Sequence, residues 1–308
     1  MPPAKPSFTT IIRPYGEAAI AQATALIAAG QPVAVPTETV YGLAADATKG
    51  EAVAAIYAAK GRPSFNPLIV HVATLEAAQK IAHFNDQALA LANAYWPGPL
   101  TLVLPVRSDS GIANLVTAGL STIAIRMPAH PAMQALLKAV GKPLAAPSAN
   151  ASGSISPTRA DHVMQSLAGR ISMIIDGGAC AVGLESTIVA VSADGLRLLR
   201  PGPVDLGLTP SASGSIEAPG QLASHYAPAK PLRLNAVTAD DNEWLIGFGA
   251  VNGDANLSAS GDLIEAAACL FAALHEADAS SKLRIAIAPI PGMGLGLAIN
   301  DRLVRAAH

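Results

Sequence analysis

The chain has 308 residues, of which 51% are hydrophobic and 14% charged, and its formal net charge is −2 at pH 7. A chain of this length and apolar content can bury a large core, which excludes a largely disordered protein. The slight negative charge argues against a broad nucleic-acid-binding face, because non-specific affinity comes mainly from basic side chains that neutralise phosphates, although a local basic cleft remains open.

Cysteine usage and the start of the chain narrow the class further. Cys180 and Cys269 stand far apart, with no CxxC pair and no histidine at metal-ligand spacing, so we expect buried, reduced thiols and no structural zinc site. The opening MPPAKPS lacks a basic segment followed by an apolar one, and no apolar run reaches the roughly 18 residues of a membrane span. We therefore expect a soluble, cytoplasmic protein.

Helical and strand patterns alternate up to residue 201. Helices are predicted over 17–29, 51–59 and 131–140, with others just before Trp96 and after residue 158. Strands are predicted over 32–35, 68–72, 100–104, 122–127, 171–176, 187–191 and 196–199, with a short one near Leu144. Residues 37–42 and 148–158 are predicted loops. This order predicts a mixed α/β domain over residues 1–201.

The composition changes after this domain. Between residues 202 and 231 the chain turns to Pro, Gly, Ser and Thr with little periodicity, which predicts an interdomain linker over 202–230. Beyond it, strands over 231–235, 243–247 and 283–288 alternate with helices over 262–275 and 297–307. The pattern indicates a small α/β domain over residues 231–308.

Short hydroxyls follow the first buried strand. Thr37, Thr39 and Tyr41 alternate, so they either continue the strand with one solvated face or contact a ligand. Gly42 favours the ligand, because a residue without a side chain permits a close backbone approach. Glu38 could face a metal or solvent, and we leave it unassigned.

Lys60 and Arg62 close the predicted helix over 51–59. They either compensate the helix dipole or bind a phosphate-bearing ligand, for which lysine supplies a compact charge and arginine a planar fork. Asn66 follows in the same short loop, where it could face one ligand together with Arg62. His71 falls within an apolar strand, where a core histidine is the commoner explanation.

Other polar positions leave two interpretations open. Arg126 shares a strand face with Thr122 and Ala124, so it needs an acidic partner, which could be an internal carboxylate or a ligand. The serine-rich run over 148–158 is either a solvated loop or a ligand loop. Residues 178–187 are a near miss for a P-loop, which disfavours a Walker-type ATPase, and residues 292–296 predict only a turn that enters a helix.

Covalent hydrolysis is disfavoured as well. The chain contains no nucleophile elbow, no HExxH helix and no Cys-His dyad motif. Positioning and charge stabilisation remain as the available chemistry.

Taken together, these segments resemble the YrdC-type threonylcarbamoyl-AMP synthases in their longer, two-domain form. The resemblance covers almost the whole chain and rests on ordered motifs: PTETVYGL at 36–43, KGRP at 60–63, NPL at 66–68, WPGPLT at 96–101, RMP at 126–128, APSAN at 146–150, EST at 185–187, RPG at 200–202, SHYAP at 224–228, GDL at 261–263 and GLGLAINDR at 294–302. It implies a YrdC-like twisted, mixed open sheet with helices, plus a smaller Rossmann-like C-terminal α/β domain.

The resemblance also implies an activity. ATP, L-threonine and bicarbonate would give L-threonylcarbamoyladenylate and pyrophosphate, for N6-threonylcarbamoyladenosine modification of tRNA. Downstream tRNA threonylcarbamoyl-transfer proteins would then receive the adenylate. Mg²⁺ is expected on the ATP phosphates rather than in a protein metal site.

Site residues follow from the matched motifs. The resemblance implies that Lys60 and Arg62 are catalytic. It implies ATP contacts from Lys60, Arg62, Asn66, Thr122, Ser148, Ser156, Arg200 and Tyr226. It implies threonine contacts from Thr39, His71, Arg126, Ser186 and the backbone near Ala146. Tyr226 further implies that the linker folds over the nucleotide as a lid, although residues 220–224 lack the basic side chains of many relatives.

Two other functions are weighed against this one. The same fold could be an RNA-binding module without chemistry, which the acidic pI and the scarcity of aromatic residues oppose. It could also transfer a carbamoyl group, as in the YrdC-like module of hydrogenase maturation proteins. That family adds acylphosphatase and zinc-finger regions, which this sequence lacks.

Overall fold

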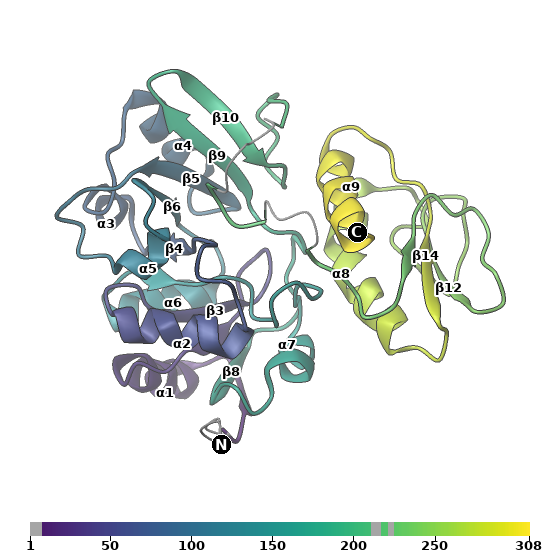
Figure 1. The fold of residues 1–308 in the computed structure, drawn as a ribbon, viewed down its shortest axis with the longest axis horizontal. Helices are drawn as coiled ribbons and strands as arrows, with labels where there is room; N and C mark the ends of the chain where they lie inside the picture. Colours follow the sequence, from purple (N-terminus) through teal and green to yellow (C-terminus); the bar gives the residue numbers. More distant parts are fainter. Residues whose placement is uncertain (1–7, 211–216, 221–224) are drawn as a thin grey trace.

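The computed structural model describes residues 8–210, 217–220 and 225–308. Within these ranges a large body carries a ten-stranded sheet and a small body carries a four-stranded sheet (Figure 1). The predicted α/β class, with a large mixed sheet and a smaller α/β unit, is confirmed. The first seven residues, which the expectation about the start of the chain concerns, lie outside the described residues. So do residues 211–216 and 221–224 of the predicted linker, which include Ser224.

The large sheet is mixed and open. Its strands stand in the order β1 (Ile11–Pro14), β8 (Met173–Asp176), β2 (Val33–Val35), β3 (Gly42–Asp46), β7 (Leu144–Ala145), β4 (Ile69–His71), β6 (Thr122–Arg126), β5 (Leu100–Pro105), β9 (Thr187–Ser192) and β10 (Gly195–Arg200). Neighbours β1 and β8, β8 and β2, β4 and β6, and β5 and β9 run parallel. The other neighbouring pairs are antiparallel.

Helices cover the two faces of this sheet unequally. α1 (Glu17–Ala28) and α6 (Pro131–Val140) pack on one face, where Ala44 of β3 joins their apolar cluster. The other face is covered by α2 (Gly50–Lys60), α3 (Leu75–Gln79), α4 (Asp86–Tyr95), α5 (Asn114–Thr117) and α7 (Ala160–Leu167). Leu43 and Ala45 point to that second face, as the two-residue period of a strand requires.

Part of the sheet is left for a site. β4, β6, β5 and β9 share a buried apolar patch that contains Ile69, Ala124 and Ile188, together with Ala218 from the segment after β10. Among the described residues this patch includes none from a helix. His71 and Arg126, which pair in register on the parallel strands β4 and β6, continue the same face at the strand ends.

Some elements escaped the sequence patterns. β1 is short, largely exposed and ends in proline, and β3 is built from Gly, Leu, Ala and Asp, which are weak strand formers apart from leucine. The expectation of two buried thiols is wrong for Cys269, which is only half-buried on a helix, whereas Cys180 is buried. Over the described residues, no helix has both the length and the apolar character that crossing a bilayer requires.

The small body has a parallel sheet covered by two helices. Its strands stand in the order β11 (Leu232–Arg233), β14 (Arg284–Ile287), β12 (Glu243–Gly247) and β13 (Ala255–Asn256). The helices α8 (Leu263–Ala279) and α9 (Leu295–Ala306) lie between this sheet and the large body (Figure 1). Gly294 precedes α9, which confirms the predicted helix-entry turn.

The two bodies are in direct contact. Val40, Ile155 and Leu184 of the large body belong to the same buried cluster as the inner faces of α8 and α9. Gly183 has a φ of +73°, and a Cβ placed there would lie 2.5 Å from the Cα of Ala268 on α8. Only glycine meets both conditions without strain. The segment 183–186 is therefore packed closely against α8 of the small body.

Candidate active site

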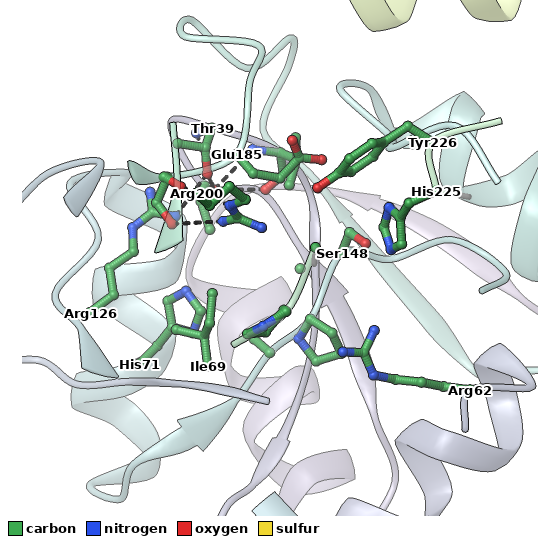
Figure 2. Close-up of a pocket in the computed structure, with 18 residues that line it drawn as sticks. Thr39, Arg62, Ile69, His71, Arg126, Ser148, Glu185, Arg200, His225 and Tyr226 are labelled. Carbon is green, nitrogen blue, oxygen red and sulfur yellow. Dashed lines mark hydrogen bonds between the residues drawn. The ribbon is translucent and has the colours of Figure 1, made fainter. Parts of the chain in front are cut away.

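A pocket lies on the open face of the large sheet, between the strand ends and the segment that leads to the small body (Figure 2). Most of the predicted site residues line it: Thr39, Arg62, His71, Arg126, Ala146, Ser148, Ser186, Arg200 and Tyr226. Thr37, Glu185, Gly220 and His225 also line it. In Figure 2, Arg126 and His71 lie at one end and Arg62 at the other.

Arg126 organises one end of the pocket. Its Nη2 donates to Glu38 Oε1 at 2.6 Å, its Nη1 to Thr39 Oγ1 at 2.9 Å, and its Nε to the carbonyl of Gly98 at 3.1 Å. Burial alone would raise the pKa of Glu38, but the charge of Arg126 together with the hydrogen bonds from Arg126 and from backbone N–H groups outweighs it, and the pKa is lowered. The internal salt bridge is thus real, and Glu38 is the partner that the sequence left unassigned.

The hydroxyls before Gly42 belong to a tight turn rather than to a strand. Thr37 Oγ1 donates to the carbonyl of Val40 at 2.7 Å and accepts the N–H groups of Thr39 and Val40 at 3.2 Å each. A Cβ on Gly42 would lie 3.3 Å from Cβ of Ala146, so the space beside Gly42 is taken by the protein, and the approach of a ligand there stays a prediction. The turn thereby holds Thr39 against Arg126.

His71 is a neutral group beside Arg126. Burial, reinforced by the charge of Arg126, lowers the pKa of His71 to about 3. Its Nδ1 is buried and has no hydrogen-bond partner among the described residues. A buried nitrogen without a partner is costly, so a polar group of a ligand is its natural partner.

Two further arginines of the pocket, Arg62 at its other end (Figure 2) and Arg200, have no carboxylate within ion-pairing distance among the described residues. Arg62 donates to the carbonyls of Asn66 and Pro67 at 3.3 and 3.0 Å, and Arg200 donates to the carbonyl and hydroxyl of Ser186 at 3.0 and 3.1 Å. Neither arginine forms an ion pair within the described ranges. Burial lowers the pKa of Arg62 to about 10 and also lowers that of Arg200. Such an arrangement favours an anionic ligand.

Lys60 stands directly behind this end. Its Nζ donates to the carbonyls of Ser148 and Asn150, and it forms no ion pair in the described part of the chain. Burial, with the charge of Arg62, lowers the pKa of Lys60 well below its usual value. In this structure Lys60 therefore supports the backbone of the loop at 148–150, which carries Ser148 into the pocket.

Three other predicted residues do not line the pocket. Asn66 is buried, and its side-chain amide has no partner among the described residues. Thr122 is the first residue of β6, whereas Arg126 is its last residue. Ser156 donates to Glu185, which does line the pocket. Their roles toward ATP, like that of Lys60, stay predictions.

Sequence reasoning missed several residues of the site. Glu185 belongs to the EST motif but carries no predicted role, yet it lines the pocket and is bound by Arg302 of α9 at 2.9 Å. Gly220 leaves room for its neighbours, because a Cβ there would lie 2.8 Å from the Tyr226 hydroxyl and 3.0 Å from Cδ of Arg200. For Arg302 a usable signal existed: it is an arginine within the apolar stripe of a predicted helix.

Comparison with known proteins assigns the chain to a family. The Sua5_yciO_yrdC family model, described as "Telomere recombination", matches residues 25–202, and the model for the "Threonylcarbamoyl-AMP synthase, C-terminal domain" matches residues 200–308. Threonylcarbamoyl-AMP synthase of Bacillus subtilis is 40% identical over 94% of this chain and 92% of its own length. The chain belongs to the threonylcarbamoyl-AMP synthase family. The resemblance drawn from the motifs is confirmed.

Other relatives agree with this assignment. Threonylcarbamoyl-AMP synthase of Pyrococcus abyssi is 37% identical over 92% of this chain and 93% of its own. The crystal structure of P. abyssi Sua5 complexed with L-threonine has a TM-score of 0.87 and 35% identity, and covers 97% of each chain. Escherichia coli YciO, with a TM-score of 0.57 and 22% identity over 65% of this chain, shares the fold of the large body.

Proposed function

We propose that the chain makes L-threonylcarbamoyladenylate and pyrophosphate from ATP, L-threonine and bicarbonate, for N6-threonylcarbamoyladenosine modification of tRNA. Family membership supports the reaction. The observation that carries it to this site is a pair of buried arginines, Arg62 and Arg200, which form no ion pair with any described carboxylate and share one pocket with the Arg126 niche. Such a pocket suits a polyphosphate beside a small amino acid.

L-Threonine would occupy the end built by Arg126. The guanidinium would face the substrate carboxylate while Glu38 keeps it in place. Thr39, the neutral His71, Ser186 and the backbone at Ala146 surround this niche and supply hydrogen bonds. That P. abyssi Sua5 is solved with L-threonine supports the choice of amino acid.

ATP would occupy the other end. Arg62 and Arg200 would bind phosphate oxygens, with Ser148 and Tyr226 on the pocket wall. Lys60 would act from behind the loop at 148–150, either through that loop or by direct contact after the loop shifts. Asn66, Thr122 and Ser156 are assigned to ATP by the family motifs alone.

The chemistry needs positioning and charge stabilisation more than acid–base catalysis. The threonine nitrogen attacks bicarbonate and water leaves, which gives a carbamate. A carbamate oxygen then forms a bond to the α-phosphorus, while the bond from that phosphorus to the bridging oxygen breaks and pyrophosphate leaves. Buried cations stabilise the negative charge that spreads over the phosphates, and two adjacent niches align the reactants.

Mg²⁺ would be bound through the ATP phosphates, whose charge it neutralises. Over the described residues no group of three or more His, Cys, Asp or Glu side chains could hold a metal ion. The carboxylates nearest the pocket, Glu38 and Glu185, are each paired with an arginine. This side-chain set fits a magnesium ion that keeps most of its waters and binds the substrate.

The linker would act as a lid. The pocket encloses about 50 Å³ in this structure, well below the roughly 300 Å³ or more of typical small-molecule sites. Pro219, Gly220, His225 and Tyr226 form part of its wall, so they would move outward to admit ATP and return to exclude water. This supports the division into a catalytic domain at 1–201, a linker at 202–230 and a C-terminal domain at 231–308.

The product is a mixed anhydride that water hydrolyses. It would pass to downstream proteins that transfer the threonylcarbamoyl group to tRNA, in the cytoplasm where tRNA is available. Direct tRNA binding by this chain is not part of the proposal.

A pyrophosphate-release assay with ATP and Mg²⁺ tests the proposal. Release should require L-threonine and bicarbonate together and should stop when either is withheld. Pyrophosphate release without threonine, or no release with all substrates, would contradict it. An RNA-binding module would shift RNA without releasing pyrophosphate, and a carbamoyltransferase would require carbamoyl phosphate instead.

A further inference from the structure

Arg302 of α9 is an arginine in an apolar stripe. Its neighbours on the buried face of the helix are Ala298, Ile299, Leu303 and Ala306, and Arg302 itself is 0% exposed. Burying a guanidinium is costly unless its partners compensate for the lost water. The groups that bind Arg302 therefore indicate its role.

Those groups come from both bodies. Nε of Arg302 donates to Glu185 Oε2 at 2.9 Å, and Nη1 donates to the carbonyl of Pro201 at 3.0 Å and to Asp301 Oδ2 at 2.7 Å. Burial alone would raise the pKa of Glu185, but the charges of Arg302 and Arg200 together with the hydrogen bonds from Ser156 and Arg302 outweigh it, so the pKa is lowered. Because Glu185 lines the pocket, α9 fixes a charged group of the site.

Arg302 also holds the aromatic wall of the pocket. Its Cζ lies 5.3 Å from the centroid of the Tyr226 ring, within the range of a cation–π contact. Phe271 of α8 is a second neighbour, with its ring centroid 5.8 Å from that of Tyr226, and the N–H of His225 donates to the carbonyl of Arg305 at 3.1 Å. The segment 225–226 is thus anchored to both helices of the small body.

The backbone conformation at Tyr226 is strained. Tyr226 has a φ of +64°, a left-handed conformation that disfavours residues with a side chain. Strain of this kind persists only where the surrounding contacts impose it, and it occurs preferentially at functional sites. The contacts from Arg302, Phe271 and Arg305 are among those that hold this segment.

We propose that Arg302 is a positioning residue for the nucleotide end of the pocket, through Glu185 and Tyr226. The small body thereby completes the ATP site without itself touching ATP. This inference rests on the proposed function and deepens it. Within the described residues Arg302 forms no hydrogen bond to the groups that hold Arg126 and Thr39 at the threonine end, which are Glu38, Gly98 and Thr37 of the large body. Loss of Arg302 should therefore weaken ATP binding and spare threonine binding.

Calorimetric titration of the full chain with ATP and Mg²⁺, and separately with L-threonine, tests this split. Arg302→Met should weaken ATP binding by about tenfold, as expected from loss of a desolvated cation contact. Arg302→Lys should fall between Arg302→Met and the wild type, because it keeps a charge but not the fork. Threonine affinity should be unchanged in both variants.

Arg233→Ala is the matched control. Arg233 is the small body's other arginine paired with a buried glutamate, and its Nη2 lies 2.5 Å from Glu243 Oε2, but neither residue lines the pocket. This variant should lower the melting temperature and leave ATP affinity as it is. A purely structural role of Arg302 predicts the same result for Arg302→Lys.

The possible results distinguish a failure of the role given to Arg302 from a failure of the proposed reaction. If the wild type releases pyrophosphate as proposed, and both Arg302 variants bind ATP as well as the wild type or better, the role of Arg302 is refuted. An equal loss of ATP and threonine affinity refutes it too, because that indicates general damage. If Arg302→Met does not fold, Arg302→Lys carries the test. A wild type that binds no ATP refutes both proposals.

Discussion

Glu38 and Arg126 form a buried ion pair, with Nη2 and Oε1 2.6 Å apart, that ties the turn after β2 to the end of β6. The carboxylate also accepts the N–H of Ala129 at 3.1 Å. The guanidinium is therefore held in position at the pocket by groups of the protein itself. Preorganisation of this kind reduces the free energy lost when a ligand is bound and oriented.

Replacing Arg126 should separate the two substrates. Arg126→Ala removes the group proposed to bind the threonine carboxylate, so the KM for threonine should rise by about tenfold or more, since charge-assisted bidentate contacts are strong. The KM for ATP should change much less, because Arg62 and Arg200 remain. Steady-state kinetics with each substrate varied in turn measures both constants. Equal increases would contradict the assignment.

Removing Arg62 should abolish turnover without destabilising the unliganded protein. Its charge is buried without a carboxylate partner in the described residues, so Arg62→Met relieves a desolvation cost while it deletes a proposed phosphate contact. The melting temperature without ligand should equal or exceed that of the wild type, and the increase caused by ATP should disappear. Arg107→Ala, at an exposed ion pair with Asp109, is the control and should leave turnover intact. A large fall in melting temperature without ligand would show that Arg62 has a structural role instead.

Gly183 and Gly178 offer a matched pair of substitutions. Both have positive φ, +73° and +82°, so alanine at either position meets a similar backbone strain. Only at Gly183 would the new Cβ approach the backbone of α8, at 2.5 Å from Ala268 Cα, whereas nothing lies within 4 Å at Gly178. Gly178→Ala should cost about 1 kcal/mol, and Gly183→Ala considerably more. Thermal unfolding compares the two, and similar losses would show that the close contact with α8 is unimportant.

Acid should weaken the contact between the two bodies. His162 of α7 and His275 of α8 stack with ring centroids 3.9 Å apart, and burial lowers the pKa of both, that of His162 to about 3. In the unfolded chain a histidine has a pKa of about 6.5, so below that pH the unfolded state binds more protons than the folded state. The free energy of unfolding therefore decreases as the pH is lowered. Full stability should be present above about pH 6.5, with a loss of about 1 to 2 kcal/mol per buried histidine by pH 5.

The variant His162→Phe keeps an aromatic stack and removes one of these titrating groups. Arg159, Asp161, Glu276 and Asp278 surround the pair. These carboxylates titrate mainly below pH 5 when unfolded, so the window from pH 7 to 5 reports on histidines. The variant should lose less stability than the wild type across it. Identical loss, measured by urea unfolding at both pH values, would remove His162 as a cause.

Elements of both bodies follow from the local sequence. The period of apolar residues predicts α6 at the bounds that the structure gives, and β12 likewise. β3 could not be predicted in this way, because its residues have little intrinsic preference for a strand and are held by β2 and β7 on either side. Such strands form through tertiary contacts rather than through local preference.

The candidate site, too, could be predicted from the sequence only in part. Motifs led to Thr39, Arg62 and Arg126, which line one pocket, while their roles toward substrates stay predictions. They did not show that Lys60 faces the backbone of the loop at 148–150, nor that Glu185 is held from α9. These relationships join segments more than eighty residues apart, |i−j| being 88 for Lys60 and Ser148 and 117 for Arg302 and Glu185. Spacing within one segment carries no information about such pairs.

The most direct test of the account follows the carbon of bicarbonate into the product. The chain is incubated with ATP, Mg²⁺, L-threonine and either ordinary or ¹³C-labelled bicarbonate, and the nucleotide products are analysed at once by mass spectrometry. We predict an adenylate that contains threonine and whose mass increases by one carbon isotope with the labelled substrate. Consumption of ATP with no threonine-containing adenylate, or an adenylate without the label, would contradict the central claim.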